Sequence, residues 1–256
     1  MKTNLFIKIA FASVVMTLAS CDKKEEDLPA PVTPPAASAP ATINPAGADA
    51  FGALIAIQTA NYVAVPFLGE INQPVNTGVA VCCNLSGGTF VDAGTVSINS
   101  LALTKQSNNT YVYTPAATNP TGPDLSDAVT WNVTGNSANF VPALNNITPS
   151  QSFPVAPKYD GVVSIPRNAA FTVSSSVLVT GADTTYFSLY SPTTSLQKKV
   201  AGDVQSVTFT AEEMATLGAG TGYVQIAPYS MSNQTFDGKK IYFINESVVT
   251  KSVTFN

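Results

Sequence analysis

The 256-residue sequence contains no histidine and a single arginine, Arg167. Histidine is the most frequent general base in enzymes and the most frequent transition-metal ligand, so its absence removes the commonest form of both kinds of site. With 12 basic against 16 acidic side chains, the sequence also lacks the basic character that nucleic-acid binding requires. We therefore expect no nucleic-acid partner, no metal site and no cofactor.

Charged residues are scarce as well, at 11% of the chain, and Ser, Thr, Asn, Gly and Pro occupy the polar positions instead. This balance is typical of extracellular β proteins and unusual for a cytosolic enzyme. The hydrophobic fraction of 45% is still high enough to form a core, so the main body is expected to fold.

The apolar run near the N-terminus, residues 9–18, is too short for a transmembrane helix, which needs about 20 residues. Its length suits the hydrophobic region of a signal peptide, and Lys2 and Lys8 supply the positive charge expected before such a region. Small residues follow, and then Cys21. We interpret residues 1–20 as a signal peptide.

The segment Leu18-Ala19-Ser20-Cys21 resembles the lipobox of bacterial lipoproteins. The resemblance implies cleavage before Cys21 and acylation of that residue, with palmitate among the expected chains, which gives a stable lipid anchor. The alternative is an ordinary secretory signal with an unrelated cysteine near its cleavage site. The membrane is thus the expected partner, through a lipid on Cys21.

The composition of residues 21–49 predicts a disordered tether. Residues 22–27 (DKKEED) form an acidic cluster, and six prolines follow within residues 28–50. Such a composition favours extended, polyproline-like conformations over a packed fold. The acidic cluster resembles the export signal of surface lipoproteins of Bacteroidota, and the alternative is a solvated charged spacer. We expect outer-membrane localisation, with display at the cell surface as the further hypothesis.

Beyond residue 50 the sequence alternates apolar and polar residues, with turn signals every eight to twelve residues. Val129, Trp131 and Val133 share one predicted face, and Trp131 is assigned to the core. Asp237-Gly238 is a predicted turn, and residues 210–213 (TAEE) form a capping box that predicts one short helix.

The predicted fold class is all-β, with two antiparallel β-sandwich domains at residues 50–155 and 156–256. The boundary is expected near residues 154–160, where two prolines interrupt the strand pattern. The second domain resembles immunoglobulin-like or fibronectin-like sandwiches of cell-surface proteins in layout. It lacks the cysteine pair of true immunoglobulin domains, and the resemblance implies no function.

Cys82 and Cys83 are adjacent in a predicted strand, so their side chains are expected on opposite faces. Neighbouring Cα atoms lie about 3.8 Å apart, below the usual disulfide range, which favours two reduced thiols. The alternative is a strained vicinal disulfide that forms an apolar step in a binding site.

Four tyrosines of the second half lie opposite the apolar positions of their strands: Tyr186, Tyr190, Tyr223 and Tyr229. If their strands are neighbours, the rings form an exposed platform suited to sugar rings or to a protein partner. The alternative is that these aromatic rings pack between strands or against the first domain.

The carboxylates are scattered and show no catalytic pair, so we expect no enzymatic activity. The first functional hypothesis is a lipid-anchored cell-envelope protein that uses its β-sandwich domains to bind a glycan or a protein. The second is a structural or accessory lipoprotein that docks on an outer-membrane assembly or protein partner. A glycan-active enzyme is a distant third.

Overall fold

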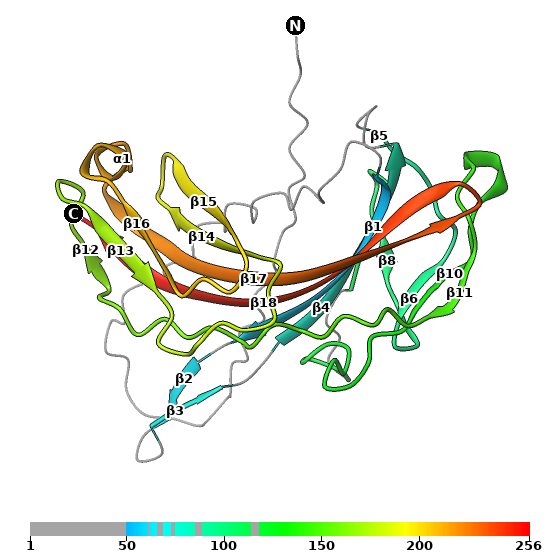
Figure 1. Cartoon of the computed structure of the whole chain (residues 1–256), viewed down its shortest axis with the longest axis horizontal. Coiled ribbons are helices and arrows are strands. Elements are labelled where there is room, and N and C mark those ends of the chain that lie inside the picture. Colours follow the sequence, from blue (N-terminus) through cyan, green and yellow to red (C-terminus); the bar gives the residue numbers. More distant parts are fainter. Residues whose placement is uncertain (1–49, 61, 66–68, 73–74, 85–88, 114–117) are drawn as a thin grey trace, which may run out of the picture. The chain divides into compact units, whose positions relative to one another are not determined.

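Figure 1 shows the computed structural model, which describes residues 50–60, 62–65, 69–72, 75–84, 89–113 and 118–256. These residues form strands almost throughout, with one short α-helix and one turn of 3₁₀ helix. The predicted all-β fold class is confirmed. Most strand pairs are antiparallel, and β18 adds two parallel pairings, with β1 and with β12.

The largest sheet has ten strands, in the order β15-β14-β17-β18-β1-β4-β9-β8, with β12 added beside β18 and β5 beside β4. Their bounds are β1 (Ala50–Ala60), β4 (Val75–Asn84), β5 (Thr89–Phe90), β8 (Thr104–Lys105), β9 (Thr110–Val112), β12 (Ser164–Ile165), β14 (Thr184–Tyr190), β15 (Ser195–Ala201), β17 (Gly220–Phe236) and β18 (Lys239–Phe255).

Three smaller sheets accompany it. A four-stranded sheet has the order β11-β10-β6-β7, and the pairs β13–β16 and β2–β3 form two-stranded sheets. Their bounds are β2 (Tyr62–Val65), β3 (Gly69–Asn72), β6 (Val96–Ile98), β7 (Leu101–Ala102), β10 (Trp131–Val133), β11 (Leu144–Ile147), β13 (Phe171–Ser174) and β16 (Ser206–Phe209).

The hairpin β17–β18 runs through the middle of the large sheet, and each of its strands has 17 residues. The predicted turn at Asp237-Gly238 closes it, with φ angles of 47° and 72°. Two successive residues at positive φ match the right-handed twist of the flanking strands, which is why Asp-Gly is favoured there. These strands are about three times as long as a typical strand.

Strand β1 enters this sheet in an unexpected place. It lies between β18 and β4, parallel to β18 from Ala50↔Lys240 to Ala60↔Val249 and antiparallel to β4. The strand that follows residues 1–49 is therefore paired on both sides.

Both hydrophobic cores lie on one face of the large sheet. The first core contains Leu54 and Phe243, packed with Val96, Trp131 and other residues of the four-stranded sheet. The second contains Phe187 and Val249 of the large sheet, packed with residues of β13, β16 and the helix. Phe243 and Val249 are six positions apart on one continuous strand and therefore point the same way. We call this face the core face and the other the reverse face.

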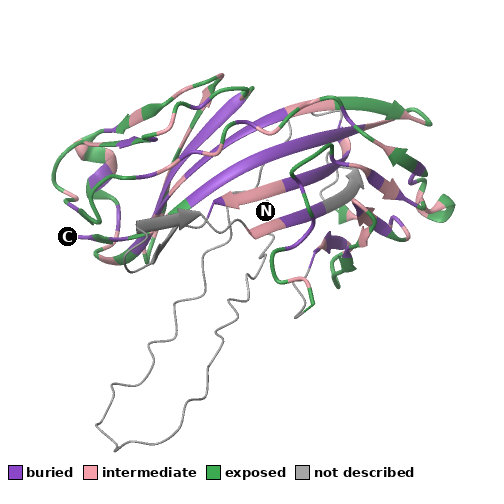
Figure 2. Cartoon of the chain, turned by 90° about the horizontal axis from the view of Figure 1, so that it is seen from below, coloured by how far each residue is buried: buried purple, intermediate pink, exposed green. Residues whose placement is uncertain are grey.

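The two halves share the large sheet instead of forming separate domains. Ile241 and Phe243, from beyond residue 156, belong to the first core, and residues 45–256 make one compact unit. The predicted boundary near residues 154–160 would assign all of β17 and β18 to the second domain. Both strands nevertheless extend across the two cores, so the boundary does not separate two domains. Figure 2 shows the long central strands buried over much of their length.

Residues 151–154, at the start of the predicted linker, are hydrogen-bonded to the core face between the two cores. Ser247 Oγ donates to the Pro154 carbonyl at 2.7 Å, and Asn245 Nδ2 donates to the Gln151 carbonyl at 2.9 Å. Ser230 Oγ donates in the same way to the Ser152 carbonyl. Buried backbone carbonyls need such partners, so these polar residues hold the crossing segment in place.

The expected short helix is α1 (Ala211–Ala215), and its capping box is complete. Thr210 Oγ1 accepts from the Glu213 backbone N–H, while the Glu213 carboxylate accepts from the Thr210 N–H. Met214 of this helix packs into the second core. Trp131 is likewise buried in the first core with Val129 and Val133, as predicted.

Candidate functional site

The four tyrosines lie on neighbouring strands and share the reverse face. Tyr190 on β14 is the register partner of Tyr223 on β17, and the rings of Tyr186 and Tyr229 stack with centroids 5.7 Å apart. The predicted neighbourhood is therefore present. The predicted exposure is not, because Tyr229 is 0%, Tyr190 8% and Tyr186 9% exposed, and only Tyr223 is half-buried.

The burial extends well beyond the tyrosines. The tyrosine face continues into a buried apolar stripe across β17, β18 and β1, which contains Ala227, Ile244, Val248 and Ile55. Strands buried on both faces carry almost continuous apolar runs instead of alternation. Residues 241–249 (IYFINESVV) are such a run, and every one of them is buried. This run is the sequence signal that could have corrected the prediction.

Glu246 interrupts this apolar run at the centre of the reverse face. It pairs across the sheet with Tyr229 on one side and with Ile57 on the other. Within the described ranges no hydrogen bond or ion pair reaches its carboxyl group, and burial raises the pKa of Glu246 to about 8. At neutral pH the group is therefore mostly protonated and neutral. No pattern in the sequence pointed to this residue.

Tyr186 lies beside Tyr229 and is influenced by Glu246. Burial first, then the neighbouring Tyr229 hydroxyl and the Glu246 charge, raise the pKa of Tyr186 to about 12. The ammonium of Lys199 lies 5.8 Å from the centre of the Tyr186 ring. Tyr186, Tyr229 and Glu246 thus form a buried polar cluster, in which the neutral forms of Tyr186 and Glu246 are favoured. We call it the reverse-face cluster.

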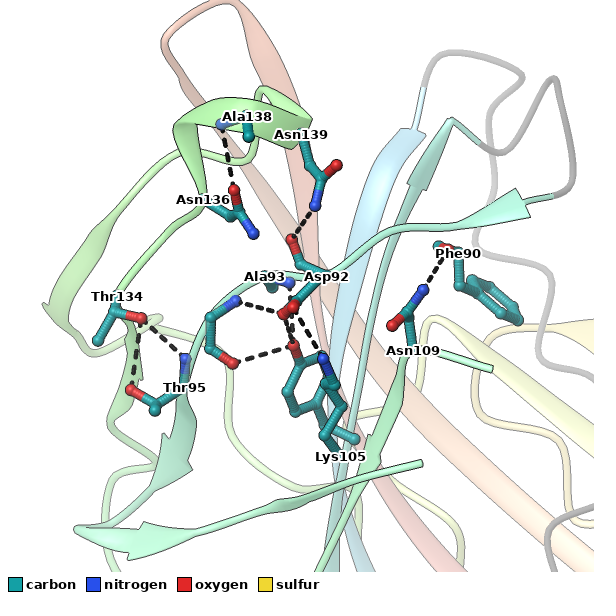
Figure 3. A network of polar contacts seen from close by, with 12 residues as sticks. Phe90, Asp92, Ala93, Thr95, Lys105, Asn109, Thr134, Asn136, Ala138 and Asn139 are labelled. Carbon is teal, nitrogen blue, oxygen red and sulfur yellow. Dashed lines mark hydrogen bonds and ion pairs between the residues drawn. The ribbon is translucent and has the colours of Figure 1, made fainter. Parts of the chain in front are cut away.

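A second polar network surrounds Asp92 at the edge of the first core (Figure 3). The Tyr111 hydroxyl donates to Asp92 Oδ1 at 2.7 Å, the Gly94 N–H donates to the same oxygen, and Lys105 Nζ pairs with Oδ2 at 2.8 Å. The Lys105 contact, then Tyr111 and Gly94, lower the pKa of Asp92 to about 2. Both carboxylate oxygens accept hydrogen bonds from residues of the fold, so we assign the network a structural role.

The Asp92 network also fixes the turn that carries the 3₁₀ helix η1 (Ser137–Asn139). Asn139 Nδ2 donates to the Asp92 carbonyl at 3.2 Å, and Asn136 Oδ1 accepts from the Ala138 N–H. Figure 3 shows this turn directly above the Asp92 carboxylate. The turn ends at Phe140, in the left-handed conformation with φ 56°.

The cysteines are only partly placed. Cys82 and Cys83 are the eighth and ninth residues of β4, paired with Gly52 and Phe90 respectively. Their side chains lie outside the described part of the chain, so the reduced pair stays a prediction. Cys21, the signal peptide and the tether also lie outside the described residues.

The described residues offer neither a metal site nor a membrane-spanning helix. Among the described residues no group of three or more His, Cys, Asp or Glu side chains is placed to hold a metal ion. Within the same ranges no helix is long and apolar enough to cross a bilayer. Comparison with known protein families and with curated proteins finds no match.

Proposed function

We propose that this chain is a lipid-anchored, non-enzymatic protein of the cell envelope. Its β-sheet body acts as a structural or accessory module that docks on an outer-membrane assembly. The observation that carries the proposal is the place of β1, which follows residues 21–49 and lies between β18 and β4. A lipid on Cys21 would then hold the body through a central strand.

This connection suits a body held under load. A pull on the N-terminal end of β1, directed along the strand, loads the hydrogen bonds to β18 and to β4 together. An edge strand pulled away from a sheet loses its hydrogen bonds one after another. A tether joined to a paired central strand therefore transmits force without opening the sheet from its edge.

The binding hypothesis is the weaker one because its surface is buried. A platform for sugar rings needs exposed aromatic faces, and three of the four tyrosines have almost none. Tyr223 keeps partial exposure but stands alone among the four. We therefore favour the structural or accessory role over glycan capture.

The described carboxylates support a non-enzymatic role. Hydrogen bonds from Ser126 lower the pKa of Asp124, and those from Ser176 and then Lys158 lower the pKa of Asp160. Glu213 is held by Lys198 and by the helix cap, which lower its pKa. Each of these three groups is engaged by a neighbour that belongs to the fold, so none of them is available as the acid or the base of a hydrolytic pair.

The anchor is tested by replacing the acylated residue in the full-length precursor. In cells that process lipoproteins, the wild type should be recovered with membranes and released by detergent, and Cys21→Ser should be soluble. A Cys82→Ser, Cys83→Ser double variant is the matched control and should remain with membranes. Recovery of Cys21→Ser in the membrane fraction would contradict the proposal.

A polysaccharide pull-down separates the two functional hypotheses. The accessory role predicts no retention of the acylated protein on cell-surface or dietary-type polysaccharides. Retention that is lost in Tyr223→Ala, a variant at the partly exposed ring, would restore glycan binding as the function.

A further inference from the structure

The end of the sheet where the chain enters is defined by register. Ala50, the first described residue, is the partner of Lys240, three positions after the Asp237 of the β17–β18 turn. The N-terminal end of β1 therefore lies at the hairpin turn, and the tether joins the body there. We call this the entry end of the sheet; Figure 1 shows β1 and the hairpin turn in the same half of the molecule.

Phenylalanines with solvent contact gather at the entry end. Six of the described phenylalanines keep some exposure, and they are Phe51, Phe90, Phe140, Phe153, Phe171 and Phe236. Phe51 lies between the paired residues Ala50 and Gly52, and Phe236 pairs with Lys239 at the turn. Phe90 pairs with Cys83, just beyond the Gly52↔Cys82 pair. Two of the six remain elsewhere in the body.

Phe140 is connected to the same end through the Asp92 network. Asp92 follows Phe90 by two residues, and its carbonyl accepts the hydrogen bond from Asn139, the neighbour of Phe140. With 76% exposure, Phe140 has the most exposed large apolar side chain among the described residues, and its ring belongs to neither core.

The backbone of Phe140 is also unfavourable for a bulky residue. A φ of 56° places it in the left-handed region, where glycine or asparagine is usual. Such strain persists only where the surrounding structure enforces it, and it is frequent at ligand-contacting sites. The hydrogen bonds of Asn136 and Asn139 enforce it here, so the turn presents an aromatic ring to solvent in a fixed position.

We propose that the entry end, with Phe51, Phe90, Phe140 and Phe236, rests on the lipid bilayer that carries the anchor. The proposal rests on the proposed function, because the acylated Cys21 would lie in that bilayer. Aromatic rings are the side chains best suited to the boundary between headgroups and acyl chains. Phe140 enters this boundary, and Phe51, Phe90 and Phe236, of which Phe51 and Phe236 also pack against the first core, contribute the exposed parts of their rings.

The charges at the entry end predict which lipids it accepts. Lys239 Nζ lies 4.9 Å from the centre of the Phe51 ring, and Asp237 is in the adjacent turn. Lys105 and Asp92 form an ion pair, so their charges cancel. Lys240, the partner of Ala50, adds one positive charge at this end, but the contact is made by apolar rings and a neutral phosphatidylcholine bilayer offers no opposite charge. Membrane contact should therefore change little with salt.

The tether makes such a weak contact sufficient. A few rings alone would bind a vesicle only transiently, as a single short lipid chain does. Once Cys21 is inserted, residues 22–49 confine the body close to the surface, so the contact becomes an intramolecular event at high effective concentration.

The test uses the full-length acylated protein in phosphatidylcholine vesicles with acyl chains that carry bromine, a contact quencher of tryptophan emission. Phe140→Trp places a fluorophore at the entry end, and Leu178→Trp places one at a 62% exposed apolar position between β13 and β14, in the other half. Trp131, 1% exposed in the first core, is the internal reference in wild-type protein.

Interfacial side chains sit about 5–10 Å deep, so position 140 should lose roughly half or more of its added emission, and its spectrum should shift to the blue. Position 178 and the wild type should be unaffected, and the result should be the same at low and high salt. Equal quenching at both positions, or none at position 140, would overturn the proposal.

Flotation and mass analysis of the same samples separate this failure from failure of the proposed function. If acylated protein floats with vesicles but shows no quenching at position 140, the proposed contact between the entry end and the bilayer is wrong, while the lipid anchor on Cys21 still stands. Protein that is neither acylated nor vesicle-bound overturns both.

Discussion

Glu246 on β18 lies directly opposite Tyr229 on β17, and both side chains are buried on the face of the sheet turned away from the two cores. A carboxyl group in this position is stable only while it is neutral. The pair therefore links the stability of the central hairpin to pH.

The Glu246→Gln variant should change how stability depends on pH. Burial raises the pKa of Glu246 from 4.5 to about 8. The folded state then holds a proton that the unfolded chain releases above its ordinary pKa, so wild-type stability is greatest below about pH 4.5 and falls as pH rises towards 8. The slope for one such group is at most about 1.4 kcal/mol per pH unit.

Urea unfolding at pH values from 5 to 8 measures this slope. Glu246→Gln keeps the size of the neutral carboxyl and should flatten the curve, so that the variant is more stable than wild type at pH 8. Glu212→Gln, at an exposed position of α1, is the control and should leave the slope unchanged. Parallel curves for wild type and Glu246→Gln would show that Glu246 is ionised in the folded protein.

Asp92→Asn should weaken the first core at neutral pH and less in acid. The partners of Asp92, with Lys105 first, lower its pKa from 3.8 to about 2. Stabilisation by the carboxylate is therefore present above pH 3.8 and is lost as pH falls through 2. Because the side chain is partly exposed, we expect a cost of only about 1 kcal/mol at pH 7.

A double-mutant cycle with Tyr111→Phe measures the coupling within this network by thermal or urea unfolding. The two substitutions should cost less together than the sum of their separate effects, because they remove the same hydrogen bond. Asp127→Asn, at another exposed aspartate, serves as the control. Strict additivity would mean that the Tyr111–Asp92 contact does not contribute to stability.

Replacing a buried tyrosine should lower the stability of the fold, and the loss should follow how deeply the ring is buried. Tyr229→Ala removes a fully buried ring and should destabilise the fold by about 3–5 kcal/mol. Tyr223→Ala, on the same strand and face but half-buried, should cost about 1 kcal/mol or less. Unfolding curves of the two variants test this difference; equal and small effects would show that Tyr229 is accessible and would return it to the candidates for ligand contact.

The place of β1 predicts strong mechanical resistance in one direction. Force between the N-terminus and the C-terminus shears β1 against β18, whereas force between position 219 and the C-terminus separates the ends of β17 and β18, where Gly220 pairs with Phe255. Single-molecule pulling should give a clearly higher unfolding force for the first geometry. A lower force for the N-to-C geometry would remove the load-bearing argument for the anchor.

Local features of this fold could be predicted from the sequence and long-range ones could not. Alternation predicted strands and the burial of Trp131, and the chemistry of Asp-Gly and of the capping box predicted the hairpin turn and α1. These signals depend on neighbouring residues. The insertion of β1 beside β18 pairs residues almost 200 positions apart, and no local pattern records such a partner.

The candidate site was predicted in part for the same reason. Strand register brings Tyr186 and Tyr229 together as expected, but burial depends on what packs over the face of the sheet, which alternation within one strand does not show. Glu246 was overlooked because a single acidic residue in an apolar run gives no sign of its environment until the strands around it are known. Cys21 and the tether are predictions from sequence throughout.

The most direct test of the whole account is the intact mass of the mature protein extracted from membranes with detergent. We predict a chain that begins at Cys21 and carries additional mass from a diacylglyceryl group and a further acyl chain on its N-terminus. A mature chain that begins at another residue, or that carries no lipid, would contradict the central claim.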